Sequence, residues 1–150
     1  MRAIEAVTGI PASPEAASVV LTDFPAYPAW AIYLQRIEGR AEAGTWIRLV
    51  EGPPGRRPYS VRTRILEATA GTRLAWAARI PGAPWLPSAV FTGTHEFLLA
   101  ALPGGGTRLT HREHFGGLLS HLSKQGAVGA DEGFAAFNEA LKRRVLELAG

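Results

Sequence analysis

The sequence contains no cysteine, and this absence removes several classes of chemistry. Disulfide bonds, thiol catalysis, iron–sulfur clusters and thiolate zinc sites all require cysteine, so any chemistry must come from histidine, carboxylate or hydroxyl groups. Long apolar runs are also missing, since no stretch approaches the roughly 20 residues with which a helix crosses a bilayer. The first ten residues lack the unbroken apolar segment of a secretory signal. We therefore predict a soluble, cytoplasmic protein.

A focused stripe of positive charge is absent from the sequence as well. The net charge of +3 and the pI near 9.8 suit nucleic-acid binding only when the basic residues are gathered and interleaved with aromatic residues. Here they are scattered, because Arg56-Arg57 follows a Pro/Gly block and Lys142-Arg143-Arg144 falls in a predicted helix. We therefore expect a solvated charged surface and no nucleic-acid partner.

The N-terminal part contains a strand followed by two short helices. Residues Ile4 to Ile10 alternate between apolar and more polar side chains, which predicts a first strand. Ser13-Pro14-Glu15 is typical of a helix start, because the hydroxyl caps the first turn and proline suits the first helical position. This helix is expected to end near Thr22, and residues 23–30 form a second, shorter turn of helix.

The remainder of the chain predicts six more strands and one long helix, so the fold class is α+β. Between about Ile32 and Phe115 apolar residues recur at every second position and are interrupted by glycine- and proline-rich turns. Short turns favour an antiparallel order of neighbouring strands. We expect a curved seven-stranded antiparallel sheet around a C-terminal helix, in one domain spanning residues 1–150. The helix begins near Asp131 and carries one apolar stripe: Phe134, Phe137, Leu141, Val145 and Leu148.

Several segments together carry a family resemblance that spans almost the whole chain. They are IPASPE (residues 10–15), LTDFPAYPAW (21–30), LAW (74–76), GTHEF (93–97), TRLTHREHFGG (107–117) and FNEALK (137–142). With these segments the sequence resembles the SRPBCC superfamily, also called START-like or helix-grip, and in particular its polyketide cyclase/dehydrase-type members. The resemblance implies a cavity between sheet and helix that binds sterols, lipids, polyketides, hormones or aromatic compounds. Only some members are enzymes, so the fold does not settle the function.

The inward face of the predicted sheet suggests an apolar pocket. A bent sheet around one helix is difficult to fill with the side chains of a short chain, and small-molecule sites are mostly apolar with few polar groups. The alternative is a close-packed core, which is the simpler interpretation for each aliphatic residue taken singly. The predicted ligand-binding residues are Trp30, Ile47, Val61, Thr63, Trp76, His95, Phe97, His111, Glu113, Phe134, Phe137 and Leu141.

His95, His111 and Glu113 are the polar residues that strand alternation places inside. If residues 103–105 form a three-residue hairpin loop, His95 lies opposite Glu113 and Phe97 opposite His111. One interpretation is a buried hydrogen-bonded pair that holds the strands in register. The other is a group that anchors a ligand hydroxyl or carbonyl, or acts as general acid and base. The spacing matches no metal-ligand motif, and we predict no metal and no cofactor.

A loop over residues 80–87 carries large apolar side chains between prolines. Trp85 and Leu86 either fold back onto the core or form a gate at the mouth of the pocket. We predict a non-catalytic protein, monomeric or homodimeric and without stable membrane insertion, that binds or transports a hydrophobic small molecule such as a lipid, polyketide or isoprenoid. The alternatives are a cyclase or dehydratase that uses the histidines and Glu113, and an interaction module of the chaperone-activator type.

Overall fold

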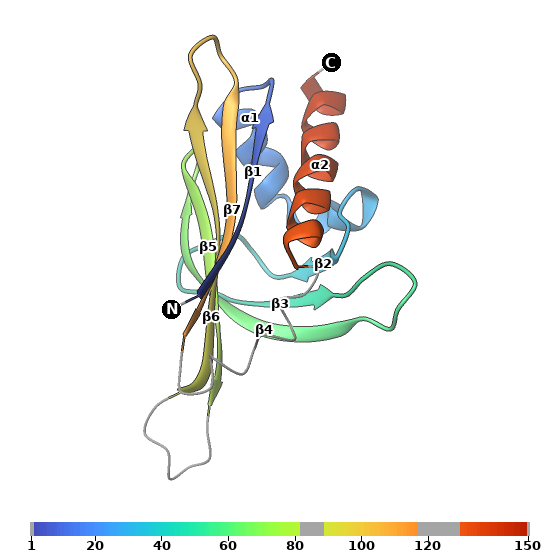
Figure 1. Cartoon of the computed structure of the whole chain (residues 1–150), viewed down its shortest axis with the longest axis vertical. Coiled ribbons are helices and arrows are strands. Elements are labelled where there is room, and N and C mark those ends of the chain that lie inside the picture. The colour runs from blue at the N-terminus through green and yellow to red at the C-terminus, as the bar shows by residue number, and fades with distance from the viewer. Residues whose placement is uncertain (1, 82–88, 117–129, 150) are drawn as a thin grey trace.

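A computed structural model describes residues 2–81, 89–116 and 130–149, in which seven strands form an antiparallel sheet that curves around a C-terminal helix (Figure 1). The strand order is β1-β7-β6-β5-β4-β3-β2, so consecutive strands pair from β2 to β7 and the first strand pairs with the last. The predicted α+β architecture is confirmed. The strands are β1 (Arg2–Ile10), β2 (Leu34–Glu38), β3 (Trp46–Glu51), β4 (Tyr59–Thr69), β5 (Arg73–Pro81), β6 (Ala89–Ala101) and β7 (Thr107–Gly116).

Two short helices connect β1 to β2, as the sequence predicts. Helix α1 (Pro14–Thr22) is capped by the Ser13 side chain and carries proline at its start, where no N–H donor is needed. The 3₁₀ helix η1 (Phe24–Ala29) follows directly. The hydroxyl of Tyr27 donates a hydrogen bond to the Leu21 carbonyl at 2.6 Å, which ties the two helices together.

The long helix α2 (Ala130–Ala149) lies on the concave side of the sheet and packs against β1 and α1 (Figure 1). Its stripe is buried at Phe137, Leu141 and Val145, as predicted. The prediction is wrong for Leu148, which is 60% exposed because it lies in the last turn, where the side chain is left largely uncovered. Among the described residues, no helix combines the length and the apolar character needed to cross a membrane.

The hairpin between β6 and β7 sets the register of the interior. The Leu102 N–H donates to the Gly106 carbonyl at 2.8 Å. Gly104 and Gly105 have φ of 94° and 101°, values that favour glycine because it has no Cβ. This three-residue loop pairs His95 with Glu113 and Phe97 with His111, which confirms the predicted register.

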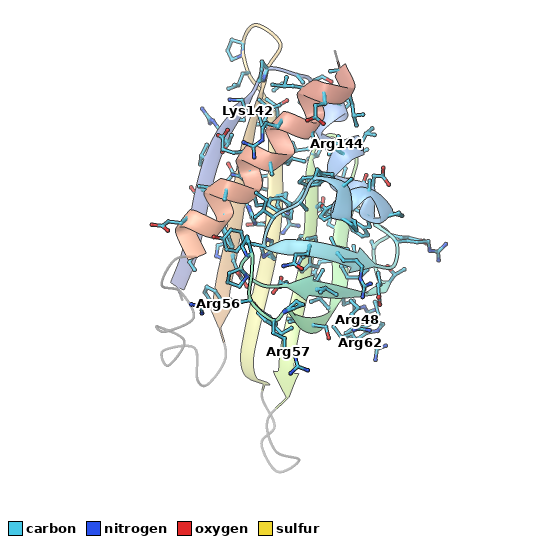
Figure 2. The ribbon with its side chains drawn as sticks, turned by 90° about the vertical axis from the view of Figure 1, so that its right-hand side faces the viewer. Arg48, Arg56, Arg57, Arg62, Lys142 and Arg144 are labelled. Carbon is cyan, nitrogen blue, oxygen red and sulfur yellow. The ribbon has the colours of Figure 1, made fainter. Side chains whose placement is uncertain are left out.

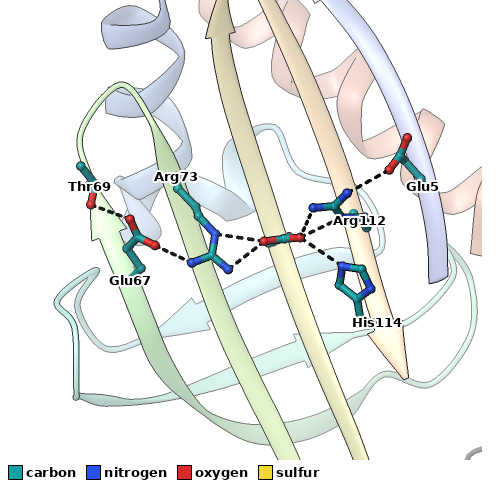
Figure 3. A network of polar contacts seen from close by, with 7 residues as sticks. Glu5, Glu67, Thr69, Arg73, Arg112 and His114 are labelled. Carbon is teal, nitrogen blue, oxygen red and sulfur yellow. Dashed lines mark hydrogen bonds and ion pairs between the residues drawn. The ribbon is translucent and has the colours of Figure 1, made fainter. Parts of the chain in front are cut away.

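The convex face of the sheet is less solvated than strand alternation suggests, because Glu96 is only 5% exposed there. Arg73 donates two hydrogen bonds to one carboxylate oxygen of Glu96, at 2.9 and 2.8 Å, and Arg112 donates to the other oxygen at 2.7 Å (Figure 3). His114 lies 3.2 Å from that second oxygen. Burial alone would raise the pKa of Glu96, but the hydrogen bonds from the two arginines outweigh it and lower the pKa to about 2.

Replacing Glu96 with glutamine should therefore reduce stability in a pH-dependent way. At neutral pH the free energy of unfolding is expected to fall by about 2–3 kcal/mol, since two arginines lose their shared charge partner. The folded pKa of about 2 lies below the unfolded value, so the stability that Glu96 supplies is complete above roughly pH 5 and is lost as the pH falls toward 2. Urea unfolding across this range tests both statements.

The matched control for this experiment is Glu42→Gln. Glu42 forms an exposed ion pair with Arg40, with Arg40 Nη2 3.5 Å from Glu42 Oε2, and exposed pairs contribute about 0–1 kcal/mol. Equal losses in the two variants at neutral pH would contradict a stabilising role for the Glu96 network.

Candidate functional site

The candidate site lies on the concave side of the sheet, where one row of cross-strand pairs brings together Trp76, His95 and Glu113. Trp76 stacks on the His95 ring with centroids 5.1 Å apart and planes 16° apart. The next row places Phe97 beside His111, with ring centroids at 4.3 Å. The period-two geometry of β6 and β7 thus turns both histidines toward α2.

Helix α2 covers His111 with residues from one of its faces. Phe134 stacks on the His111 ring at 4.0 Å with the planes 3° apart, and Phe137 meets it edge-on at 5.2 Å. Asn138 follows Phe134 by four residues, so the two side chains share a face of the helix. Oδ1 of Asn138 lies 2.9 Å from Nδ1 of His111.

The two histidines contact one another directly. Nε2 of His95 lies 2.5 Å from Nε2 of His111, whereas Nδ1 of His95 is 3.7 Å from the Glu113 carboxylate. One interpretation of the sequence is a hydrogen bond between His95 and Glu113, but the close contact of His95 in the structure is with a second imidazole. The inward tilt of both rings toward the helix explains the difference, because facing strands bring diagonal neighbours within reach of aromatic side chains.

Hydrogen bonds to Asn138 define which nitrogen of His111 carries the proton. The Asn138 amide nitrogen lies 3.3 Å from the Ala6 carbonyl, an acceptor only, and 3.2 Å from the Thr8 hydroxyl. The amide oxygen must therefore face His111, and Nδ1–H of His111 donates to it. Burial, and then the charge of His95, lower the pKa of His111 well below its ordinary value, so His111 is neutral.

A neutral His111 protonated at Nδ1 has one remaining nitrogen, Nε2, and this nitrogen is an acceptor. The partner at 2.5 Å, Nε2 of His95, must then be the donor. The chain of hydrogen bonds runs in one direction, from His95 through His111 to Asn138. Nδ1 of His95 is left to exchange a proton with Glu113 or with a bound molecule.

Glu51 and Tyr59 extend the polar group, and neither is among the site residues predicted from the sequence. They form a cross-strand pair and a side-chain hydrogen bond at one end of β3 and β4. Burial, together with the charge of Glu113, raises the pKa of Glu51 despite an opposing effect of His95. Tyr59 is 58% exposed, but its partial burial, and then the charge of Glu51, raise its pKa to about 12. The sequence does hold a signal for Glu51: the alternation of Ile47 and Leu49 with polar residues continues to Glu51 and places it on the same face of β3.

Two predicted ligand-binding residues have buried polar atoms that find no hydrogen-bond partner among the described residues. They are Oγ1 of Thr63, a residue that is 1% exposed, and Nε1 of Trp30. Trp30 packs on Phe137 with ring centroids 5.4 Å apart, so its indole is part of the layer between η1 and α2. Buried polar groups are almost always hydrogen-bonded, and each exception calls for an explanation.

The other predicted ligand-binding residues lie in or beside the buried core. Five of them are fully buried: Ile47, Trp76, Phe97, Phe137 and Leu141. Val61 and Phe134 are half-buried. Burial alone does not distinguish core packing from ligand contact. Trp85 and Leu86 lie outside the described residues.

A hollow of about 440 Å³ beside the β6–β7 turn is lined by residues 9–11 and 102–106, none of which belongs to the predicted site. Within the part of the chain that the structure describes, no cluster of three or more histidine, cysteine or acidic residues is arranged to hold a metal ion.

Solved structures share this architecture over nearly its whole length. Protein MLL2253 from Mesorhizobium loti gives a TM-score of 0.73 at 17% identity and covers 99% of both chains. The Zhui aromatase/cyclase from Streptomyces sp. R1128 gives 0.73 at 15% identity, over 99% of this chain and 96% of that one. Norcoclaurine synthase from Thalictrum flavum gives 0.69 at 14%, over 97% and 87%. Identities this low show a shared helix-grip fold and nothing more specific.

A family model assigns the chain more closely. The model described as "Polyketide cyclase / dehydrase and lipid transport" matches residues 1–146, and the chain therefore belongs to this family. The resemblance to polyketide cyclase/dehydrase-type members of the SRPBCC superfamily is confirmed. No curated protein matches the sequence.

The direction of the hydrogen-bond chain can be tested by replacing Asn138 with leucine. The substitution keeps the size of the side chain but removes the amide that bonds to the Ala6 carbonyl and to Nδ1–H of His111, and of the hydrogen bonds to α2 it leaves His111 only the one with the backbone of Phe134. We expect a loss of about 2 kcal/mol in the free energy of unfolding. The ¹⁵N shifts of the imidazole rings should show His111 as the Nδ1–H tautomer in the wild type and as a mixture in the variant. Unchanged His111 shifts in the variant would contradict the assignment, and the neighbouring exposed change Glu139→Gln is the control.

Proposed function

We propose that the protein binds a hydrophobic small molecule that carries at least one oxygen atom, in a pocket between the sheet and α2. The observation that carries this proposal is the pair of buried, unpartnered polar atoms, Oγ1 of Thr63 and Nε1 of Trp30. A ligand oxygen would complete the hydrogen bonding of either atom, because the hydroxyl donates or accepts and the indole N–H donates.

The surroundings of these atoms suit an apolar ligand. Aromatic rings form a continuous layer from Trp76 through Phe97 to Phe137, with centroids 5.5 Å apart at each step. Nδ1 of His95 supplies a further polar contact within this layer. Small-molecule sites combine apolar walls with a few oriented polar groups in this way. The family description, which includes lipid transport, supports the same class of ligand.

A pair of probes that differ by one hydroxyl tests the proposal. We expect the protein to bind 2-naphthol more tightly than naphthalene. The nearly isosteric change Thr63→Val, or His95→Phe, should weaken 2-naphthol binding by about five- to tenfold, the value of one hydrogen bond, and leave naphthalene binding nearly unchanged. Fluorescence titration measures both affinities. Ser60→Ala, on the outer face of the same strand, is the matched control.

Native mass spectrometry of the purified protein addresses the natural ligand. A molecule of defined mass that is released by solvent extraction would support the proposal. Failure of both 2-naphthol and naphthalene to bind, together with repeated preparations that carry no small molecule, would contradict the proposal that the protein binds a hydrophobic small molecule. The cytoplasmic location, the single domain and the monomeric or dimeric state stay predictions.

A cyclase or dehydratase is the second candidate, because Nδ1 of the buried His95 faces the Glu113 carboxylate, whose side chain is 25% exposed. The distance from this nitrogen to Glu113 is 3.7 Å, and burial raises the pKa of nearby Glu51. An imidazole beside carboxyl groups can serve as general base and general acid, as the aldol and dehydration steps of a cyclase require. Two solved structures with this fold are named as an aromatase/cyclase and a synthase, which supports testing for catalysis.

An enzyme and a binding protein respond differently to His95→Gln. Turnover of a linear poly-β-keto thioester should fall by at least about a hundredfold if His95 is a general base, whereas 2-naphthol affinity should change by about tenfold or less. Product formation is followed by mass spectrometry, with Ser60→Ala as the control. Binding of the thioester without any turnover by the wild type would exclude this reaction.

A further inference from the structure

The outer face of β2, β3 and β4 carries a cluster of exposed arginines that the sequence does not reveal. Arg48 pairs directly with Arg62 across β3 and β4, and Trp46 pairs with Arg64. Figure 2 shows the side chains of Arg48 and Arg62 close together. The basic residues are scattered along the sequence, and strand pairing brings these arginines together. We call this surface the outer arginine patch: Arg36, Arg48, Arg62 and Arg64, with Trp46.

The positive charge of the patch is not balanced by carboxylates. Glu38 lies 3.0 Å from Arg36 and 3.6 Å from Arg48 and serves both of them. The Arg62 guanidinium lies over the Trp46 ring, 4.8 Å from its centroid, and Arg64 donates to the Gly44 carbonyl at 3.2 Å. Within the described part of the chain, neither Arg62 nor Arg64 has a carboxylate partner within 4.0 Å.

This imbalance has a cost for the folded protein. Like charges directly opposite each other on neighbouring strands destabilise a sheet, and Arg48 and Arg62 are placed in that way. The other half of the same face is arranged differently, since Arg73 and Arg112 both share Glu96 and each has a second carboxylate (Figure 3). A bound anion would balance the charge that the fold leaves uncompensated at the patch.

We propose that the outer arginine patch binds the surface of an anionic lipid bilayer. Clusters of four or more basic residues bind anionic headgroups. Apolar side chains share the face, because Trp46 is 54% exposed and Leu66, which follows Arg62 and Arg64 at alternate positions of β4, is 49% exposed. Tryptophan and leucine beside arginine are typical of surfaces that lie at the boundary between headgroups and acyl chains.

The shape of the face favours a bilayer over a nucleic acid. Single-stranded nucleic acids usually lie in a positively charged groove that follows the backbone. The patch lies on the convex side of a sheet that curves around α2 (Figure 1), so its arginines and Trp46 point outward to a broad surface. Inward residues Ile47, Leu49 and Thr63 alternate with the patch residues along β3 and β4. The patch is therefore separate from the candidate ligand site, and the proposal does not depend on the proposed function.

Vesicle sedimentation tests the proposal with the full chain. We expect binding to phosphatidylcholine vesicles that contain phosphatidylglycerol, no binding to phosphatidylcholine alone, and weaker binding as salt is added. The double change Arg48→Ser with Arg62→Ser should lower the partition coefficient by about thirtyfold. The double change to lysine should retain most of the binding. The serine substitutions remove a repulsive pair together with the Arg48–Glu38 ion pair and the Arg62–Trp46 contact, so we expect the variant to fold with a stability close to that of the wild type.

The matched control removes the same charge elsewhere. Arg108 on β7 and Arg143 on α2 are exposed, and replacing both with serine should change the partition coefficient by no more than about twofold. Equal losses in the two double variants would show attraction by net charge alone and would overturn the proposal. Failure to bind anionic vesicles, with tight binding of single-stranded oligonucleotide or polyglutamate, would overturn it in favour of a different partner. Binding of 2-naphthol, measured on the same samples, reports on the interior site separately.

Discussion

The arrangement of the interior depends on one amide group that joins the helix to the sheet. Asn138 bonds to β1 through the Ala6 carbonyl and the Thr8 hydroxyl, and to β7 through His111. Apolar packing alone would let α2 slide or rotate, because dispersion and burial are not directional. The amide selects one position of the helix, and in that position Phe134 lies flat on the His111 ring. The tautomer of His111, and hence that of His95, follows from this contact.

The two faces of the sheet bury polar groups in different charge states. On the concave side, His111 is buried as a neutral ring, so no charge has to be transferred from water into the apolar layer. On the convex side, Glu96 is buried as a charged carboxylate, and two arginines compensate for its desolvation. Glu96 lies between the inward-facing His95 and Phe97 on β6, and His111 lies opposite Phe97 on β7, so two adjacent strands carry the two kinds of buried group.

Much of the fold could be predicted from the sequence, because it depends on local patterns. Alternating residues and the short loop before Gly106 were sufficient to place His95 opposite Glu113, since a shift by one residue would turn every side chain to the other face. Asn138 was missed as a site residue because its partners lie on β1 and β7, far away in sequence. Glu96 was missed because its burial results from arginine side chains that fold over it. Contacts of this kind depend on tertiary placement, which residue spacing does not encode.

The fixed tautomers of the two histidines limit what the interior can do with a proton. Nε2–H of His95 donates to His111, and the hydrogen-bond chain ends at the Asn138 amide oxygen, while the Asn138 amide nitrogen donates to the Ala6 carbonyl. A proton that arrives at Nδ1 of His95 therefore has no exit along this hydrogen-bond chain and must leave from Nδ1 itself. This hydrogen-bond chain can therefore donate and accept a proton at one atom, Nδ1 of His95. It cannot conduct protons from one side of the sheet to the other.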